Sequence, residues 1–279
     1  MKKVNSLLLF AAFVLATFAA CSKNENPTNA NPQTYVLVHG AWQAPYVWNS
    51  VRANLEQTGH KVIVVELPGH GNDHTPAQNL SLDVYRDKVI EAMSTVQGKV
   101  ILVGHSMAGM VITHVAEKLP SKISQLVYIG AFLPSSGQAI ADLAPSDTDS
   151  KLGGSLLPSA DQLTLDVKRD SLTWLFINDG TETDKQQVVA NYRSEPAIPF
   201  GNKVTVSREN FGSVPKVYIK TLQDIVISPA LQDRMIAAAG IEVVYSINSS
   251  HSPFLSQPKA VSDLLLEIAQ DYTIQSEVK

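Results

Sequence analysis

The segment from Val100 to Gly109 reads Val-Ile-Leu-Val-Gly-His-Ser-Met-Ala-Gly. Its β-branched and leucine run is typical of a buried parallel strand, and the run breaks at Gly104 before a helical pattern that continues to Lys118. A tight strand-to-helix turn of this kind presents a serine in a strained backbone conformation and needs small residues two places before and after it. Gly104 and Ala108 meet this need, although alanine replaces the usual glycine at the second place. The segment therefore predicts that Ser106 is a nucleophile.

Ser106 could instead be an ordinary helix N-cap, so residues elsewhere in the chain must distinguish the two interpretations. A serine hydroxyl is a weak nucleophile until a base removes its proton, and a third group must orient that base. In folds with this turn the acid follows the serine and the histidine comes last. His114 lies inside the helix after Ser106, whereas His251 lies in a loop after the last predicted strand. We therefore expect His251 to be the base.

Asp224 fits the acid best. It follows the predicted strand Val217–Lys220 and its extension, so it falls at the carboxyl end of that strand. A turn-forming aspartate is the alternative reading of this position. The other aspartates considered lie before the strand or on the next helix, and they are Asp142, Asp147, Asp149 and Asp233.

An oxyanion hole requires two backbone N–H groups that face the carbonyl oxygen of a substrate. One should come from Met107, directly after the nucleophile, and the other from the loop after the first strand. That loop reads His39-Gly40-Ala41-Trp42, so Ala41 is in place to donate. His39-Gly40 could also form a simple turn.

Outside this segment, apolar runs of strand length alternate with helical patterns. The predicted strands are 35–38, 62–65, 100–103, 123–129, 216–220 and 242–247, and the predicted helices include 48–57, one capped by Ser81 or Asn79, 107–118, 229–239 and 258–272. Strand and helix alternating at short intervals predict an α/β fold, with a mostly parallel sheet covered by helices on both faces.

The alternation lapses between Leu133 and Pro215, where proline and glycine are frequent and helix-like pieces occur only at Asp161–Val167 and Asp184–Tyr192. An insertion of about eighty residues is long for a connection between two strands. Ligands of such sheets bind beyond the carboxyl ends of the strands, where this insertion starts and finishes. We expect a cap over the site at about residues 133–215, with a surface excursion without a role as the alternative.

The N-terminal residues 1–20 resemble a signal peptide: Lys2 and Lys3 precede an apolar run from Leu7 to Ala20 that is too short to span a bilayer. The run ends in Phe18-Ala19-Ala20-Cys21, which resembles a bacterial lipobox with phenylalanine where leucine is preferred. We expect lipidation of Cys21 and an outer-membrane or periplasm-facing lipoprotein, with a soluble secreted or periplasmic protein as the alternative. Polar residues 21–33 then form a flexible tether to a single domain at 34–279.

The composition narrows the range of partners. The net charge of −4 becomes −6 when residues 1–20 are removed, because they carry Lys2 and Lys3 and no acid. A mildly acidic chain without a basic cluster is unsuited to nucleic acid. Neither a Walker motif nor a dinucleotide fingerprint occurs, so no cofactor is expected. His70 and His74 have an i, i+4 spacing, but neighbouring glycines argue against a helix that would present both to a metal.

Several segments together resemble the α/β-hydrolase family, and more narrowly the branch of plant methyl-salicylate-type esterases, hydroxynitrile lyases and bacterial pyrethroid-hydrolase-like esterases. The matching segments are 35–42, 59–62, 99–107, 221–224 and 250–254. The resemblance covers the chain from about residue 34 onward, and the insertion matches weakly. It implies a triad of Ser106, Asp224 and His251 and an oxyanion hole of Ala41 and Met107.

The resemblance also distinguishes ester hydrolysis from carbon–carbon cleavage. Lyases of this branch carry a lysine directly after the catalytic histidine and a threonine in the first loop, whereas this chain has Ser252 there and Gly40-Ala41 in the loop. We therefore expect a serine carboxylesterase acting on small-molecule esters, with a carbon–carbon lyase or a slow-turnover ligand-binding protein as alternatives. The oligomeric state is left open. Apolar candidates for the substrate pocket, each of which could equally belong to the core, are Trp42, Phe132, Leu133, Trp174, Phe254 and Leu255.

Overall fold

A computed structural model describes residues 32–277. Its central feature is a six-stranded sheet in the order β2-β1-β3-β4-β8-β9, in which every neighbouring pair is parallel. The strands are β1 (Thr34–Val38), β2 (Lys61–Val65), β3 (Val100–His105), β4 (Ile123–Ile129), β8 (Lys216–Thr221) and β9 (Val243–Ile247). The predicted α/β fold with a parallel sheet is confirmed.

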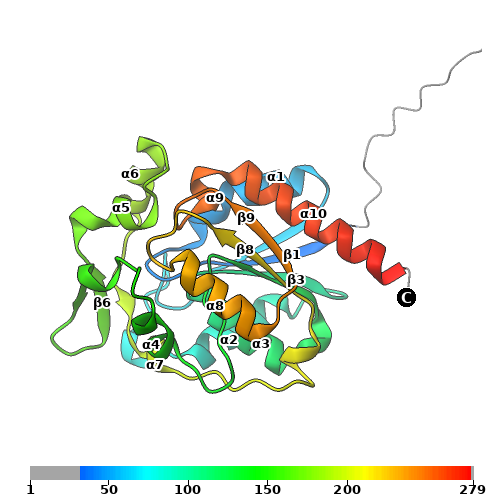
Figure 1. Ribbon diagram of the computed structural model, residues 1–279, viewed down its shortest axis with the longest axis horizontal. Helices are drawn as coiled ribbons and strands as arrows, with labels where there is room; N and C mark the ends of the chain where they lie inside the picture. The colour runs from blue at the N-terminus through cyan, green and yellow to red at the C-terminus, as the bar shows by residue number, and fades with distance from the viewer. Residues whose placement is uncertain (1–31, 278–279) are drawn as a thin grey trace, which may run out of the picture.

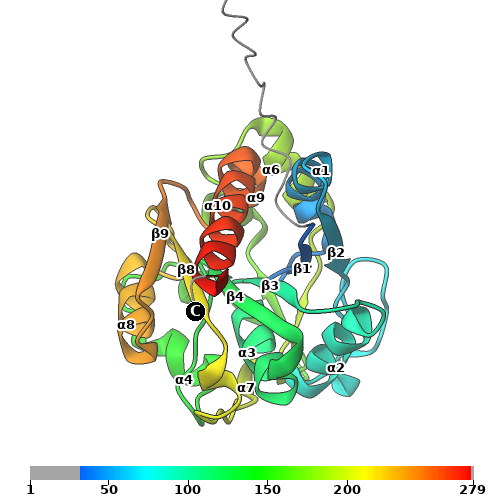
Figure 2. The same cartoon turned by 90° about the vertical axis from the view of Figure 1, so that its right-hand side faces the viewer.

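Helices cover both faces of this sheet because successive side chains of each strand point to opposite sides. Val36 and Leu102 pack with one group of helices, while Leu37 and Val103 pack with the other. Figures 1 and 2 show α1 and α10 on one face and α2, α3 and α8 on the other. The helices are α1 (Asn49–Gln57), α2 (Leu82–Met93), α3 (Ala108–Lys118), α8 (Pro229–Ala239), α9 (Pro253–Ser256) and α10 (Pro258–Glu277).

The insertion between β4 and β8 builds a separate unit at one end of the molecule, on the left in Figure 1. Its centre is a small antiparallel sheet, β5-β6-β7, which we call the insertion sheet. The elements are α4 (Ile140–Leu143), β5 (Leu156–Pro158), β6 (Thr164–Val167), α5 (Leu172–Phe176), α6 (Glu182–Ala190), β7 (Glu195–Pro196) and α7 (Ile198–Gly201).

One expectation for the insertion is wrong. The piece at Asp161–Val167 is not helical: Gln162 forms a turn with φ 60°, and β6 follows it. The apolar residues Leu163, Leu165 and Val167 recur with period two, which is the period of a strand. The second piece forms α6, which begins two residues before the predicted start because Thr181 provides a capping box.

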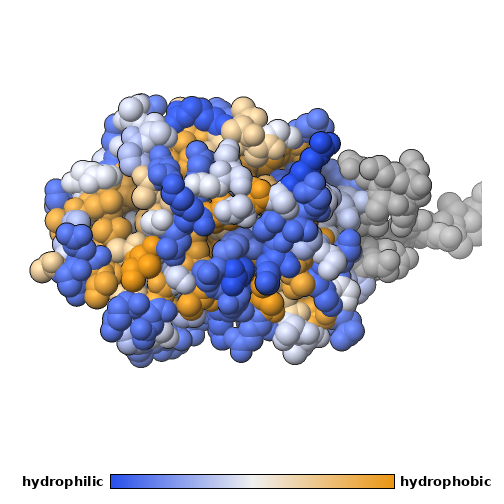
Figure 3. All heavy atoms as spheres, turned by 90° about the horizontal axis from the view of Figure 1, so that it is seen from below, coloured by the Kyte–Doolittle hydropathy of each residue, from blue (hydrophilic) through white to orange (hydrophobic). Residues whose placement is uncertain are grey.

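Within residues 32–277, no helix is both long and apolar enough to cross a bilayer. On the face in Figure 3, polar and apolar residues are interspersed, and the apolar ones gather toward the end that carries the insertion. Exposed large apolar side chains of the insertion are Leu157, Trp174 and Val189. The predicted signal peptide, Cys21 and nearly all of the tether lie outside the described residues.

Candidate active site

Ser106 lies in the turn between β3 and α3 and adopts a left-handed backbone conformation, with φ 54°. This conformation is strained for a residue with a side chain. Its surroundings leave no room for larger neighbours. A Cβ on Gly104 would lie 2.8 Å from the carbonyl oxygen of Ala108, and one on Gly109 would lie 2.0 Å from that of Phe132. Backbone packing therefore requires glycine at positions 104 and 109.

Three of the predicted site residues form one chain of hydrogen bonds. Ser106 Oγ lies 3.0 Å from His251 Nε2, and His251 Nδ1 lies 2.7 Å from Asp224 Oδ2. Because the carboxylate can only accept, Nδ1 carries the proton, and Nε2 accepts from the serine hydroxyl. The three residues come from the carboxyl ends of β3, β8 and β9, and each is at most 5% exposed.

The Asp224 carboxylate is held in one orientation by its own loop. Oδ1 accepts from the backbone N–H groups of Val226 and Ile227, at 2.8 and 3.0 Å. Oδ2 accepts from Thr221 Oγ1 at 2.8 Å in addition to His251. Each carboxylate oxygen therefore accepts two hydrogen bonds, and these bonds fix Oδ2 as the oxygen that faces His251.

The loop after β1, His39–Trp42, packs directly on the serine, and we call it the β1 loop. A Cβ on Gly40 would lie 2.7 Å from Ser106 Cβ. This close approach sets the β1 loop, which includes Ala41, against the turn that contains Ser106 and Met107. Among the described residues, no acceptor is bonded to the N–H of Ala41 or of Met107. Both predicted donors therefore remain available to a substrate oxygen.

His105, next to the serine, supports the loop at residues 248–252, which carries His251, a role that the sequence did not reveal. Its Nε2–H donates to the carbonyl oxygen of His251 at 2.8 Å, and the two rings lie 4.5 Å apart. Burial lowers the pKa of His105 well below its ordinary value, so the ring stays neutral beside His251.

The insertion contacts each loop of the site through a carboxylate: Asp147, Asp179 and Glu195, which we call the insertion carboxylates. Asp147 accepts from the Ser228 N–H and hydroxyl, just beyond Asp224. Asp179 accepts from the hydroxyls of Ser250 and Ser256, on either side of His251. Glu195 accepts from the Trp42 N–H. No sequence signal pointed to these contacts, because they depend on how the insertion folds back.

The structure separates the predicted pocket residues. Phe132 and Leu133 are buried in the core on the α2, α3 and α8 side, and Leu255 packs partly buried against the α1 and α10 side. Phe254 was predicted wrongly, since it is fully buried between Trp48 and His105. Trp174 was predicted wrongly too, since it is 48% exposed on the outer surface.

Trp42 is the predicted pocket residue that lies closest to aromatic neighbours from the insertion. Its ring centroid is 5.7 Å from that of Phe176, which in turn lies 6.0 Å from the His251 ring. Phe176 was missed, because it belongs to a stretch whose periodicity is too weak to place it. The apolar surface beside His251 is therefore built by the insertion together with the β1 loop.

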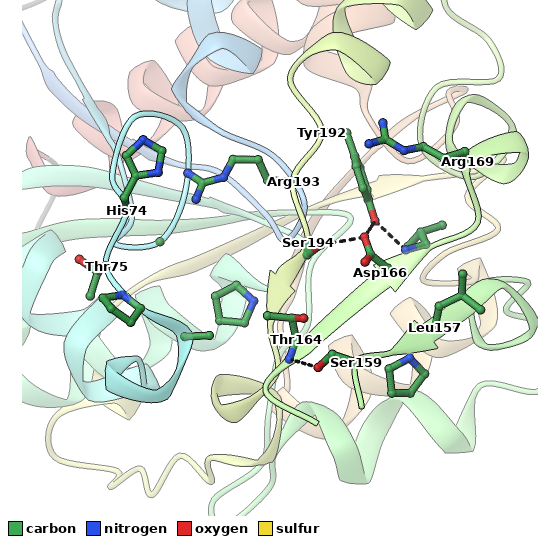
Figure 4. A pocket seen from close by; sticks show the side chains of 16 residues that line it. His74, Thr75, Leu157, Ser159, Thr164, Asp166, Arg169, Tyr192, Arg193 and Ser194 are labelled. Atoms are coloured by element: carbon green, nitrogen blue, oxygen red, sulfur yellow. Dashed lines mark hydrogen bonds between the residues drawn. The ribbon is translucent and has the colours of Figure 1, made fainter. Parts of the chain in front are cut away.

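A cavity of about 870 Å³ lies against the insertion sheet (Figure 4). It is lined by residues such as Asp166, Tyr192 and Arg193, and by His74, but by none of the triad residues. His70 is buried instead and faces Glu195. Within the described residues, no cluster of three His, Cys, Asp or Glu side chains has the arrangement of a metal site.

Comparisons with known proteins agree with the geometry. The profile of the alpha/beta hydrolase family matches residues 35–264. Methylesterase 17 of Arabidopsis thaliana is 29% identical over 253 residues, which cover 85% of this chain and 92% of that protein. Five chloroplastic proteins of the same plant, named as candidate methylesterases, are 30% to 32% identical, and this chain's matches span 56% to 72% of their length.

Solved structures show the same fold. An extracellular alpha/beta-hydrolase from a Paenibacillus species, described as sharing structural and functional homology with tobacco salicylic acid binding protein 2, has a TM-score of 0.72 at 25% identity, over 85% of this chain and 98% of that chain. A pyrethroid hydrolase from Sphingobium faniae JZ-2 has a TM-score of 0.74 at 22% identity, over 86% and 98%. The predicted resemblance is confirmed, and the chain belongs to the alpha/beta hydrolase family.

Proposed function

We propose that this protein is a serine carboxylesterase that hydrolyses small-molecule carboxylic esters through an acyl-enzyme on Ser106. The observation that carries the proposal is the continuous chain from Ser106 Oγ through His251 to Asp224, at 3.0 and 2.7 Å. In this chain the serine hydroxyl donates to His251 and His251 donates to Asp224, which is the arrangement that activates a serine nucleophile. Membership of a family whose relatives include methylesterases supports the class of reaction.

In the proposed reaction, Ser106 Oγ attacks the ester carbonyl carbon as His251 Nε2 takes the hydroxyl proton. The N–H groups of Ala41 and Met107 bind the oxyanion of the tetrahedral intermediate, and removal of one such donor typically costs about 3 kcal/mol. The imidazolium then protonates the leaving alkoxide. Water, deprotonated by His251, attacks the acyl group, and collapse of the second intermediate frees the acid and restores the serine.

The residue after His251 supports hydrolysis rather than carbon–carbon cleavage. Ser252 is fully buried, and its hydroxyl accepts from Gln43 Nε2 at 2.9 Å. The residue at the position where related lyases carry a lysine therefore links Gln43, directly after the β1 loop, to the loop that carries His251. Ser252 therefore places no cationic side chain where a leaving cyanide would need one.

The test compares Ser106→Ala with Ser94→Ala, an exposed serine at the end of α2, in hydrolysis of p-nitrophenyl acetate and a panel of methyl esters. We expect hydrolysis and fluorophosphonate labelling to disappear in Ser106→Ala and to persist in Ser94→Ala. Full activity in Ser106→Ala would overturn the proposal. Cyanide release from mandelonitrile without ester cleavage would favour the lyase, and tight ester binding without turnover would favour a binding protein.

We also propose that the protein is exported and anchored through a lipid on Cys21. The proposal is supported by the apolar run Leu7–Ala20 and by the small residues before the cysteine. Metabolic labelling with a fatty acid should mark the wild type and not Cys21→Ala. A labelled Cys21→Ala variant, or an unlabelled wild type in the periplasm, would rule out the anchor.

A further inference from the structure

Glu195 is a fully buried carboxylate that takes no direct part in the proposed reaction. It lies in β7, and its Oε2 accepts from the backbone N–H of Trp42 at 2.7 Å and from His70 Nε2 at 2.8 Å. Burial of a carboxylate is costly unless charged or polar donors compensate it. The two donors that compensate Glu195 come from the β1 loop and from the turn after β2, not from the insertion itself.

The backbone that Glu195 holds is strained. Trp42 has a φ of 58°, in the left-handed region, which costs about 1–2 kcal/mol for a residue with a Cβ. Its indole Nε1–H also donates to the carbonyl oxygen of Leu165 at 2.9 Å. The insertion sheet therefore binds Trp42 at its backbone through Glu195 and at its side chain through Leu165.

Both peptide planes that meet at Ala41 are fixed by buried side chains. The first plane joins the Gly40 carbonyl to the Ala41 N–H, and His39 Nδ1–H donates to that carbonyl at 2.9 Å. His39 Nε2 accepts from the Leu67 N–H, and burial lowers the pKa of His39 to about 3, so the ring remains neutral. The second plane ends in the Trp42 N–H, which Glu195 holds. Loss of the Glu195 contact would free the second plane and leave the first plane, which carries the Ala41 N–H, held by His39 alone.

His70 reinforces the charge on Glu195. Its Nδ1 faces the carbonyl oxygen of Pro68 at 3.0 Å, and its Nε2 faces Glu195, so both ring nitrogens face acceptors. Only the imidazolium can donate to both. Burial lowers the pKa of His70, but the charge and hydrogen bond of Glu195 outweigh burial and raise it above the ordinary value.

We propose that Glu195 is a positioning residue for the oxyanion hole, because its carboxylate holds the Trp42 N–H and thereby keeps the adjoining Ala41 N–H directed at the substrate. The inference rests on the proposed function, in which Ala41 binds the oxyanion. It assigns the insertion a part in catalysis through the β1 loop.

The other face of the same sheet offers a matched control. Asp166 lies in β6 on the cavity side, where it accepts from Tyr192 Oη at 3.0 Å and from Ser194 Oγ at 2.8 Å (Figure 4). Asp166→Asn removes one carboxylate charge from the insertion sheet without touching the β1 loop. A loss of activity that arose from a weakened insertion would appear in this variant too.

The experiment measures kcat and KM for p-nitrophenyl acetate in the wild type, Glu195→Ala, Glu195→Gln and Asp166→Asn, together with amide hydrogen exchange at Trp42. We expect Glu195→Ala to lower kcat by about 10²-fold with little change in KM, since the oxyanion forms after binding. Exchange at Trp42 should accelerate in that variant. Glu195→Gln should recover most of kcat, because its amide oxygen can still accept from Trp42.

Three results overturn the inference: wild-type kcat in Glu195→Ala, a loss in Asp166→Asn equal to that in Glu195→Ala, or no recovery in Glu195→Gln while Trp42 stays protected. These outcomes differ from failure of the proposed function, in which the wild type itself hydrolyses no ester and resists fluorophosphonate. The exchange measurement needs no substrate. It therefore reports on the contact between Glu195 and Trp42 in either case.

Discussion

The parallel sheet and the insertion both contribute to the site, but in different ways. The sheet supplies Ser106, Asp224 and His251 from the carboxyl ends of three strands, so strand order and register already bring them together. The insertion supplies Asp147, Asp179 and Glu195, which bind the segments that follow β8, β9 and β1. The sheet thus provides the reacting groups, and the insertion restrains segments around them.

The difference shows that a site can depend on a region with little regular structure. The loops after β1, β8 and β9 extend beyond the sheet, and each of them is bound by one of the insertion carboxylates. Each loop offers N–H or hydroxyl donors that a carboxylate can satisfy. Variants of single carboxylates can therefore separate the contribution of the sheet from that of the insertion.

We expect the largest effect from Asp224→Asn, which alters a triad residue carried by the central sheet. An amide at this position no longer favours the tautomer that has its proton on His251 Nδ1, so kcat should fall by about 10⁴-fold. The measurement is steady-state ester hydrolysis, with circular dichroism to show that the fold persists. An activity within tenfold of wild type would mean that Asp224 does not orient the histidine.

Asp147→Asn should mainly affect stability rather than chemistry. Asp147 is buried and accepts from both the N–H and the hydroxyl of Ser228, and bonds to a buried charge contribute about 1.5–3 kcal/mol. We expect the free energy of unfolding in urea to decrease by about that amount. Wild-type stability together with a large loss of kcat would contradict the prediction that Asp147 restrains a loop and takes no part in the reaction.

The pair His70–Glu195 should make part of the stability depend on pH. Because the folded-state pKa of His70 is raised, its contribution is complete below its ordinary pKa and is lost as pH rises through the raised value. The groups that face His70 are Glu195, His39, Tyr85 and Arg193.

The Glu195→Gln variant has no carboxylate at this position to raise the pKa of His70. The loss of stability with rising pH should therefore be absent from this variant. Urea unfolding of both proteins from about pH 6 to about pH 9 measures the difference. Lys216, whose pKa burial lowers to about 8, titrates in both proteins and cancels in the comparison. Parallel stability curves for the two proteins would contradict the assignment of His70 as an imidazolium.

Asp179→Asn should have the smallest effect. Asp179 is exposed, and its hydroxyl donors Ser250 and Ser256 can bind water instead. We expect kcat to change by less than about threefold and stability by less than about 1 kcal/mol. The same assays apply, with Asp170→Asn, another exposed aspartate of the insertion, as the control. A loss approaching that of Asp224→Asn would show that the insertion takes a direct part in the chemistry.

The sequence by itself determined the sheet, its covering helices and the positions of Ser106, Asp224 and His251. The strand and helix periods, the small residues that flank Ser106 and the order of the three residues are local or linear features, so they can be recognised without coordinates. Phe254 shows the limit of this reading, because an apolar residue next to His251 gave no indication of the side on which it would pack.

The tertiary structure alone decided the roles of Asp147, Glu195, His70 and His105. Glu195 lies 153 residues from its partner Trp42, in a segment without clear periodicity, and nothing local distinguishes it from a surface glutamate. Its burial depends on donors from two distant loops. A carboxylate acquires such a role only when folding brings those donors to it, because the free energy that stabilises it comes from the partners and not from its own position in the chain.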